Sequence, residues 1–382
     1  MSSNTFDAAL AALRCWCAAV TGDAPPPLAE PVRRAAWLAA GQPPAAGLPT
    51  IDLDKPLASV FSRVMRQDGG EPPEIYVRRA PLALDNTTLF PATSPDEAAG
   101  EIPAAALREA LAQLDPRLLP PAQVEGLLFA LQRHAWCLPS PLPGVSLYDY
   151  ARVHAALAAA LADSPDGDLF LLGGDLSGVQ RFIYTLQARG AARQLRGRSL
   201  YLQLLTEAIA RWVLAEIELP TCNLLYCGGG RFYVLLPAEA EERLPALRQY
   251  IGERLLHRHG NALFMALGGA RYVLADGSQR VWERVNDELD IDKRRRFAAL
   301  DPSLLDNLLF TPRSPLQDTG AESDTPMDAL SESFVQLAPQ LHNIPYLLMY
   351  SVRAPDLRTA PAAIEPVSWH RVLREFRLFA RP

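Results

Sequence analysis

The sequence predicts an α+β protein in which a helical N-terminal part precedes a domain built on a ferredoxin-like sheet. A buried-looking strand at 169–173 and a β-hairpin at 223–236 predict the sheet. The hairpin turns at a glycine triplet, 228–230, and a helix with one strongly apolar face, 199–216, separates it from the first strand. The order β-α-α-β-β-α-β favours a ferredoxin-like arrangement.

The N-terminal part is expected to be a series of helices, because apolar residues recur there at helical spacing. Residues 71–100 are rich in prolines and turn formers, so we expect an extended connector. Ser146 can cap the last helix of the series. The helices are expected over 6–20, 28–41, 56–65, 103–114, 121–135 and 146–161.

The sheet domain should begin after the turn signal Pro165-Asp166-Gly167. Its elements are expected over 169–173, 177–185, 199–216, 223–226, 231–236, 241–257 and 263–267. They are followed by an amphipathic helix over 281–300, a polar flexible segment over 311–331 and a strand over 344–351. The predicted domains are therefore 1–70, 71–165, 166–275 and 276–382.

Composition limits the possible functions. The 382 residues carry a net charge of −6, so the whole molecule is no general polyanion binder. Five scattered cysteines without a C-x-x-C pair suggest a reducing compartment and no zinc site. No apolar run reaches the ~18 residues of a membrane span, and the N-terminus lacks a signal-peptide pattern, so we expect a cytoplasmic protein with no membrane partner.

The first candidate site residue is Asp175, which follows the first predicted strand. A carboxylate there can bind a divalent cation that carries nucleotide phosphates. The neighbouring Gly174, Ser177 and Gly178 could expose backbone amides to phosphate. An equally good interpretation makes Asp175 a helix-capping residue.

The second candidate is the hairpin tip, Gly228, Gly229 and Gly230, followed by Arg231. Palm-type nucleotidyl cyclases carry a metal-binding Gly-Gly-Asp at such a tip, but Gly230 has no carboxylate. Taken alone, the triplet is more simply an ordinary tight turn.

Arginines between the two candidates could grip triphosphate or RNA, because no acidic residue lies between 176 and 206. A solvated helix entry is the plainer alternative. The arginines are Arg189, Arg193, Arg196 and Arg198.

Three segments carry a family resemblance: 174–183 (GDLSGVQRFI), 195–202 (LRGRSLYL) and 223–233 (NLLYCGGGRFY). With weaker matches at 56–61, 145–149 and 293–297, the chain resembles the large signature subunit of type III CRISPR interference complexes. That family makes cyclic oligoadenylates from ATP when target RNA is bound. The resemblance implies a degenerate HD-like helical unit, a cyclase-like (GGDEF-like) palm and a small α/β linker domain.

The departures from the family are as informative as the matches. No His-Asp pair is present, and Ala36 stands where a metal-binding aspartate is usual, so we expect the HD nuclease activity to be lost. The family's zinc-binding cysteines are missing, and so is the second palm with its Gly-Gly-Asp-Asp. The chain should therefore not polymerise ATP alone.

The resemblance implies an ATP-binding half-site, with Mg²⁺ or Mn²⁺ as the metal and Asp175 as its candidate ligand. The expected partners are a second-palm polypeptide, the backbone subunits of the effector complex, and guide and target RNA. The implied nucleotide-binding residues are Gly174, Asp175, Ser177, Gly178, Arg196, Arg198, Gly228, Gly229, Gly230 and Arg231.

Two other hypotheses remain open. The chain could be a non-catalytic scaffold of the same ribonucleoprotein complex, or the product of a decayed gene. A stand-alone cyclase is disfavoured, because even a homodimer of two such palms would lack the hairpin carboxylate at Gly230.

Overall fold

The computed structural model describes residues 3–63, 74–83, 85–163, 168–184, 191–272, 278–303, 305 and 306. The chain divides into two compact units. One, the helical unit, comprises 1–169, 214–225 and 235–238; the other, the sheet unit, comprises 170–213, 226–234 and 239–382. The predicted polar segment 311–331 and the predicted strand 344–351 lie outside the described residues.

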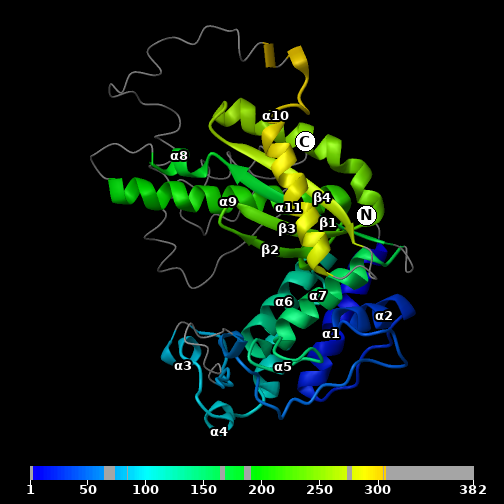
Figure 1. Ribbon diagram of the computed structural model, residues 1–382. Helices are drawn as coiled ribbons and strands as arrows, with labels where there is room; N and C mark the ends of the chain where they lie inside the picture. Colours follow the sequence, from blue (N-terminus) through cyan, green and yellow to red (C-terminus); the bar gives the residue numbers. More distant parts are fainter. Residues whose placement is uncertain are drawn as a thin grey trace. The chain divides into compact units, whose positions relative to one another are not determined.

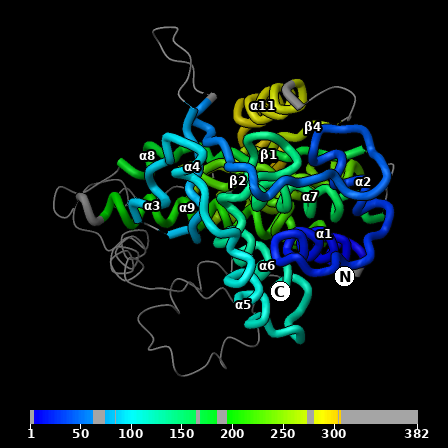
Figure 2. The backbone as a smooth tube through the Cα atoms, turned by 90° about the horizontal axis from the view of Figure 1, so that it is seen from below, coloured from blue at the N-terminus to red at the C-terminus, as the bar shows by residue number. Residues whose placement is uncertain are grey.

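The helical unit contains most of the helices expected from the sequence. In Figure 2, α1, α5 and α6 lie side by side, and α7 packs on α1, α2 and α6. Ser146 caps α7 as predicted, accepting the backbone N–H of Asp149 at 3.0 Å. The elements are α1 (Ser3–Thr21), α2 (Glu30–Ala39), η1 (Val60–Arg63), α3 (Asn86–Leu89), α4 (Pro95–Ala98), α5 (Ala104–Ala112), α6 (Pro120–Ala135), α7 (Leu147–Ala160) and η2 (Thr221–Asn223).

The helix predicted over 56–65 was wrong. Of its described residues, 56–63, Val60–Arg63 form a single 3-10 turn, and Ala58 pairs instead with Tyr76 in an antiparallel bridge. Tyr76 pairs in turn with Ala92, so the predicted connector contains isolated β-bridges as well as two one-turn helices. The backbone groups of this short segment are satisfied by non-local partners, which local spacing does not reveal.

The core of the helical unit contains a buried, hydrogen-bonded aromatic cluster. Trp16 donates its indole N–H to Nδ1 of His154 at 2.8 Å. Since indole is only a donor, His154 must carry its proton on Nε2, which lies 2.7 Å from the carbonyl oxygen of Val32. Burial lowers the pKa of His154 to about 4, against a smaller opposing effect of the Val32 carbonyl. Both ring nitrogens are thus satisfied in the neutral state.

The sheet unit contains a four-stranded antiparallel sheet in the order β2-β3-β1-β4, with α11 lying across it in Figure 1. Strand β1 is buried along nearly its whole length, as befits a central strand. Beyond β1 (Leu169–Ser177), the elements are α8 (Val179–Tyr184), α9 (Ala191–Ile217), β2 (Leu224–Gly228), β3 (Arg231–Pro237), η3 (Ala238–Arg243), α10 (Leu244–His259), β4 (Phe264–Tyr272) and α11 (Ser278–Arg294).

The sheet brings glycines opposite large aromatic rings. A Cβ built on Gly174 would meet the ring of Phe232 at 2.1 Å, and one on Gly269 would meet the ring of Phe170 at 2.1 Å. These glycines therefore leave room for the rings of the neighbouring strands.

Helix α11 packs on β4 through a buried stripe of Val281, Val285 and Leu289, while most intervening residues are exposed. Gly268 of β4 allows the close approach, because a Cβ there would lie 2.4 Å from the backbone nitrogen of Leu289. The predicted amphipathic helix 281–300 is thus confirmed through Arg294, where α11 ends.

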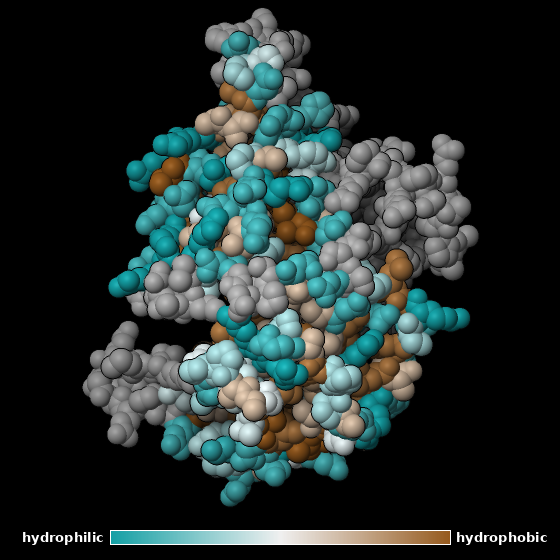
Figure 3. Space-filling view, turned by 90° about the vertical axis from the view of Figure 1, so that its right-hand side faces the viewer, coloured by the Kyte–Doolittle hydropathy of each residue, from teal (hydrophilic) through white to brown (hydrophobic). Residues whose placement is uncertain are grey.

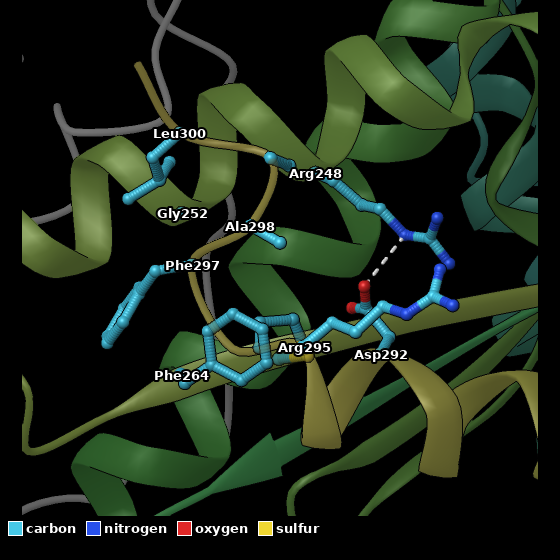
Figure 4. Close-up of a pocket in the computed structure, with 10 residues that line it drawn as sticks. Arg248, Gly252, Phe264, Asp292, Arg295, Phe297, Ala298 and Leu300 are labelled. Carbon is cyan, nitrogen blue, oxygen red and sulfur yellow. Dashed lines mark ion pairs between the residues drawn. The ribbon is translucent and has the colours of Figure 1, made fainter. Parts of the chain in front are cut away.

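The C-terminal half of α11 is also held by a polar contact. Asp292 accepts the backbone N–H of Leu267 at 2.9 Å and pairs with Arg248 of α10 at 3.2 Å. Figure 4 shows this ion pair at one end of a small pocket that also contains Arg295 and the rings of Phe264 and Phe297. Burial raises the pKa of Asp292, and the amide and guanidinium oppose that shift.

Within the described residues, no helix is long and apolar enough to cross a membrane. On the face shown in Figure 3, apolar residues form groups set among hydrophilic ones.

The buried His154 predicts acid sensitivity. Its folded pKa of about 4 lies below the unfolded value of about 6.5, so the unfolded state binds more protons between these values. The contribution to stability is complete above about pH 6.5 and is lost as pH falls towards 4, amounting to about 3 kcal/mol.

Urea unfolding between pH 7.5 and 4 measures this effect. His154→Gln should lower the stability at pH 7.5 but flatten its decline towards acid pH. The matched control is His257→Gln, since His257 is exposed. An unchanged acid slope in His154→Gln would contradict the assignment.

Candidate functional site

The candidate site is organised by the pairing of β1 with β3. The N–H of Leu176 donates to the carbonyl of Gly230 at 2.8 Å, and the N–H of Ala238 donates to the carbonyl of Asp168 at 3.1 Å. The residue numbers of both pairs have the same sum, so the strands keep one antiparallel register. That register places Asp175 directly opposite Arg231, on the same face of the sheet.

Asp175 and Arg231 form an ion pair across the two strands. Oδ2 of Asp175 lies 2.7 Å from Nη2 of Arg231. The Asp175 side chain is 13% exposed and that of Arg231 is 49% exposed. The carboxylate is therefore mostly shielded, while half of the guanidinium surface faces solvent.

A second cation reaches the same carboxylate oxygen from α11. Nζ of Lys293 lies 2.8 Å from Oδ2 of Asp175 and 3.2 Å from Oδ1 of the more exposed Asp290. Burial would lower the pKa of Lys293, but its contacts with the two carboxylates outweigh burial, and its pKa is raised. We call Asp175, Arg231 and Lys293 the Asp175 cluster.

The Asp175 cluster does not fit a divalent metal. Two positively charged groups already occupy the coordination space of Oδ2, and a cation would be repelled by both. Among the described residues, no group of three or more His, Cys, Asp or Glu side chains could hold a metal ion. The predicted metal-ligand role of Asp175 therefore has no support in this geometry.

Asp175 also does not act as a helix cap. Strand β1 continues through Ser177, so Asp175 lies inside the strand rather than after it. The first bond of α8 runs from the N–H of Phe182 to the carbonyl of Gly178. The carboxylate is engaged instead by Arg231 and Lys293.

The hairpin tip is a two-residue turn between β2 and β3. Gly229 has φ 61° and Gly230 has φ 84°, both in the left-handed region. Positive φ at both central residues is typical of a type I′ turn, whose twist matches that of the strands. Gly229 is exposed and Gly230 is buried, so only the first of them offers its backbone to solvent.

The other two predicted glycines have packing reasons of their own. Gly174 makes room for Phe232, as described above. Gly178 has φ 93°, and a Cβ there would lie 1.9 Å from the carbonyl oxygen of Ala262. Both glycines are thus required by the fold, whether or not a ligand approaches them.

Arg198 lies in a buried cluster beneath α8. It is 3% exposed, donates to the carbonyl of Phe182 at 2.8 Å and stacks its guanidinium over the Phe182 ring. Phe182 also contacts Tyr201 and His259, whose hydroxyl and Nε2 lie 2.7 Å apart. Burial, and to a smaller extent the charge of Arg258, lower the pKa of His259 to about 4.

The remaining predicted residues are distributed around these elements. Ser177 is half-buried at the end of β1, and Arg196 is exposed on the first turns of α9. Arg189 lies outside the described residues, and the side chain of Arg193 does as well. The structure therefore brings together Asp175, Gly230 and Arg231, and keeps Arg198 in the core.

Sequence reasoning missed Lys293 as a member of the site. It begins the basic run Lys293–Arg296, in which a charged side chain is ordinarily solvated. Two signals could have singled it out: it is one of only two lysines in the chain, and it lies four residues after the buried Leu289.

Comparison with known proteins finds relatives for part of the chain. A family model described as "Csm1 subunit domain B" matches residues 168–309, which include the whole described sheet and α11. The chain is 27% identical to the single-strand-specific deoxyribonuclease Cas10/Csm1 (subtype III-A) of Methanocaldococcus jannaschii, over 45% of this chain and 29% of that protein. Part of this chain is homologous to Cas10/Csm1. The chain spans less than a third of the length of this Cas10/Csm1 relative.

Solved Csm1 structures share the fold. The Csm1–Csm4 subcomplex of the type III-A CRISPR-Csm interference complex matches with a TM-score of 0.57 and 22% identity, covering 83% of this chain and 40% of that Csm1 chain. The Csm1–Csm4 cassette in complex with one ATP matches with a TM-score of 0.55 and 21% identity, covering 72% and 38%. The expected resemblance to the large subunit of type III complexes is thereby confirmed for part of the chain.

The Asp175 cluster predicts a specific response to charge removal. Asp175→Asn leaves Arg231 and Lys293 without their shared counter-ion, so stability should fall by about 1–3 kcal/mol. Asp290→Asn, which removes only the exposed partner of Lys293, should cost less than about 0.5 kcal/mol.

Urea unfolding of both variants checks this, and a thermal melt with 10 mM MgCl₂ adds a direct metal test. We expect no Mg²⁺-dependent rise in the melting temperature of the wild-type chain. A stabilising Asp175→Asn change, together with Mg²⁺ stabilisation of the wild type, would contradict the counter-ion assignment.

Proposed function

We propose that this chain contributes an ATP-binding half-site to a type III CRISPR RNA-guided antiviral effector complex. A separate palm with Gly-Gly-Asp-Asp would complete the site for cyclic oligoadenylate synthesis. The observation that carries the proposal is Arg231, a half-exposed guanidinium oriented by Asp175 beside a glycine turn. An oriented guanidinium suits bidentate contact with phosphate.

The predicted residues have four roles in this proposal. Arg231 and Arg196 contact phosphate, while Ser177 and the backbone of Gly228 and Gly229 line the approach. Asp175 orients Arg231. The remaining residues shape the site from within the fold: Gly174, Gly178, Arg198 and Gly230.

The metal of the proposed reaction, Mg²⁺ or Mn²⁺, would be held by the partner palm. Such an ion would bridge the nucleotide phosphates and neutralise developing charge. This chain's own contribution is fixed positive charge from side chains, so the isolated chain should bind ATP without a divalent cation.

The proposed partners follow from the same assignment. They are the second-palm polypeptide, the backbone subunits of the complex, and guide and target RNA. The matched solved structures contain Csm1 together with Csm4, which supports a role inside an assembly.

A non-catalytic scaffold role in the same complex is the second candidate, and a decayed gene product would behave similarly. The observation that favours it is the full neutralisation of Asp175 by side chains, which removes the one carboxylate predicted to hold a metal. The two roles differ in one measurable property, the affinity of this chain for ATP.

Calorimetry with ATP, in EDTA and in Mg²⁺, tests the proposed function. We expect binding in both buffers and a loss of about tenfold or more in Arg231→Ala, because a charge-assisted hydrogen bond is removed. Arg294→Ala, an exposed arginine at the end of α11, serves as the control and should bind normally.

Mixing the chain with a Gly-Gly-Asp-Asp palm, target RNA, Mg²⁺ and ATP should then yield cyclic oligoadenylate. Negligible ATP binding by the wild-type chain, with normal assembly into the complex, would favour the scaffold.

We also propose that the helical unit has lost nuclease activity. Ala36 is fully buried, and its carbonyl oxygen accepts the Tyr150 hydroxyl inside the Trp16–His154 cluster. A carboxylate introduced there would be desolvated in a packed core. The described residues contain no group of three or more His, Cys, Asp or Glu side chains that could hold a metal ion with it.

An assay of Mn²⁺-dependent cleavage of labelled single-stranded DNA tests whether the nuclease activity is lost. The wild-type chain and Ala36→Asp should both be inactive, and Ala36→Asp should also be destabilised by several kcal/mol. The M. jannaschii relative serves as a positive control. Metal-dependent cleavage by the wild-type chain would refute the proposal.

A further inference from the structure

Tyr226 is a large exposed aromatic residue on the edge of the sheet, next to the hairpin tip. It lies on β2, the outer strand, and is 52% exposed. The two-residue turn sets Gly228 opposite Arg231 and Tyr226 opposite Tyr233. Because alternate residues of a strand share a face, Tyr226, Gly228, Arg231 and Asp175 all lie on one face of the sheet.

The Tyr226 ring is supported from the inner side of the sheet. Its centroid lies 6.3 Å from that of Tyr233, at an interplanar angle of 45°. Tyr233 meets Trp282 of α11 edge-on at 4.6 Å, and its hydroxyl lies 3.4 Å from Oδ1 of Asn286. A row of packed rings therefore stands behind Tyr226 and limits its movement.

The ring leans along β2 towards the hairpin tip. A Cβ built on Gly228 would lie 3.0 Å from the hydroxyl oxygen of Tyr226. Gly228 thus has the space above its backbone occupied by the end of the ring, and the ring is directed towards the row of Arg231 and Asp175.

We propose that Tyr226 is a stacking platform for the base of an adenine nucleotide whose phosphates are bound by Arg231. Tyr226 and Arg231 are diagonal neighbours on adjacent strands, with a separation of about 7–8 Å. That spacing suits a mononucleotide, whose base and phosphates lie at opposite ends of one ribose. An exposed ring beside an oriented guanidinium offers both surfaces that such a ligand presents.

This inference rests on the proposed function and adds a specificity-determining residue to it. The Asp175 cluster recognises only charge, so it would bind any polyphosphate. Tyr226 would supply the preference for a nucleotide over a bare phosphate chain, because only a base can stack on the ring.

Parallel titrations with ATP and with tripolyphosphate separate the two claims. Tyr226→Ala should weaken ATP binding about tenfold, in line with the loss of one stacked base, and leave tripolyphosphate binding unchanged. Tyr226→Phe should bind ATP nearly as the wild type does. Gly228→Ala, which displaces the ring end, should weaken ATP binding several-fold.

Phe129→Ala is the matched control, since Phe129 is an exposed aromatic residue of α6 (57%) remote in sequence from the site. Circular dichroism and a melt establish that each variant is folded. Because Tyr226 and Phe129 are both more than half exposed, their variants are expected to fold.

The outcomes are distinguishable. If ATP and tripolyphosphate bind but Tyr226→Ala binds ATP like the wild type, the platform is refuted and the proposed function stands. If the wild-type chain binds neither compound, both proposals fail. If single-stranded RNA binds through Tyr226 far more tightly than ATP does, the assignment to a mononucleotide is overturned.

Discussion

The antiparallel register between β1 and β3 is the constraint on which the candidate site depends. It is fixed by backbone hydrogen bonds at both ends of the pair, from Leu176 to Gly230 and from Ala238 to Asp168. A shift by one residue would send Asp175 to the opposite face, away from α11. The same register sets Phe232 over Gly174, so the packing of the core and the geometry of the site share one cause.

The ion pairs of Asp175 join three elements of the sheet unit, β1, β3 and α11. One mostly buried carboxylate holds two cations from different elements, Arg231 of β3 and Lys293 of α11. The carboxylate thus links α11 to the two central strands, in addition to the apolar stripe of α11 on β4. It also anchors the half-exposed guanidinium through an ion pair at 2.7 Å, which lowers the entropic cost of binding an anion.

Much of this fold could be predicted from the sequence. The continuous apolar run of β1, the hairpin around the glycine triplet and the cap at Ser146 are local signals, and the structure confirms them. The helix prediction for 56–65 failed because the backbone of this segment pairs with Tyr76, which pairs in turn with Ala92. Both partners are distant in sequence. Local spacing carries no information about such partners.

The site was predictable only in part, for a related reason. The hairpin and the first strand pointed to Asp175 and Arg231, but the identity of the partners of Asp175 depends on where α11 crosses the sheet. The sequence therefore did not distinguish Lys293 from the arginines that follow it. Arg198 resembled a surface arginine in the sequence, although it is buried against Phe182. Side chains supplied by a crossing helix cannot be assigned from strand patterns alone.

The left-handed backbone at Gly230 has a consequence for how this hairpin can change. Aspartate and asparagine tolerate positive φ better than other residues with a side chain, at a cost of about 1–2 kcal/mol. A single exchange at the turn could therefore return an acidic group to the hairpin tip without rebuilding the loop. A Cβ on Gly230 would lie 3.5 Å from the side chains of both Leu176 and Val179, however, so such a group would begin against apolar neighbours rather than beside Arg231 or Lys293. Cation binding at the tip would thus require the new carboxylate to turn away from these apolar neighbours, and not only the exchange of one residue.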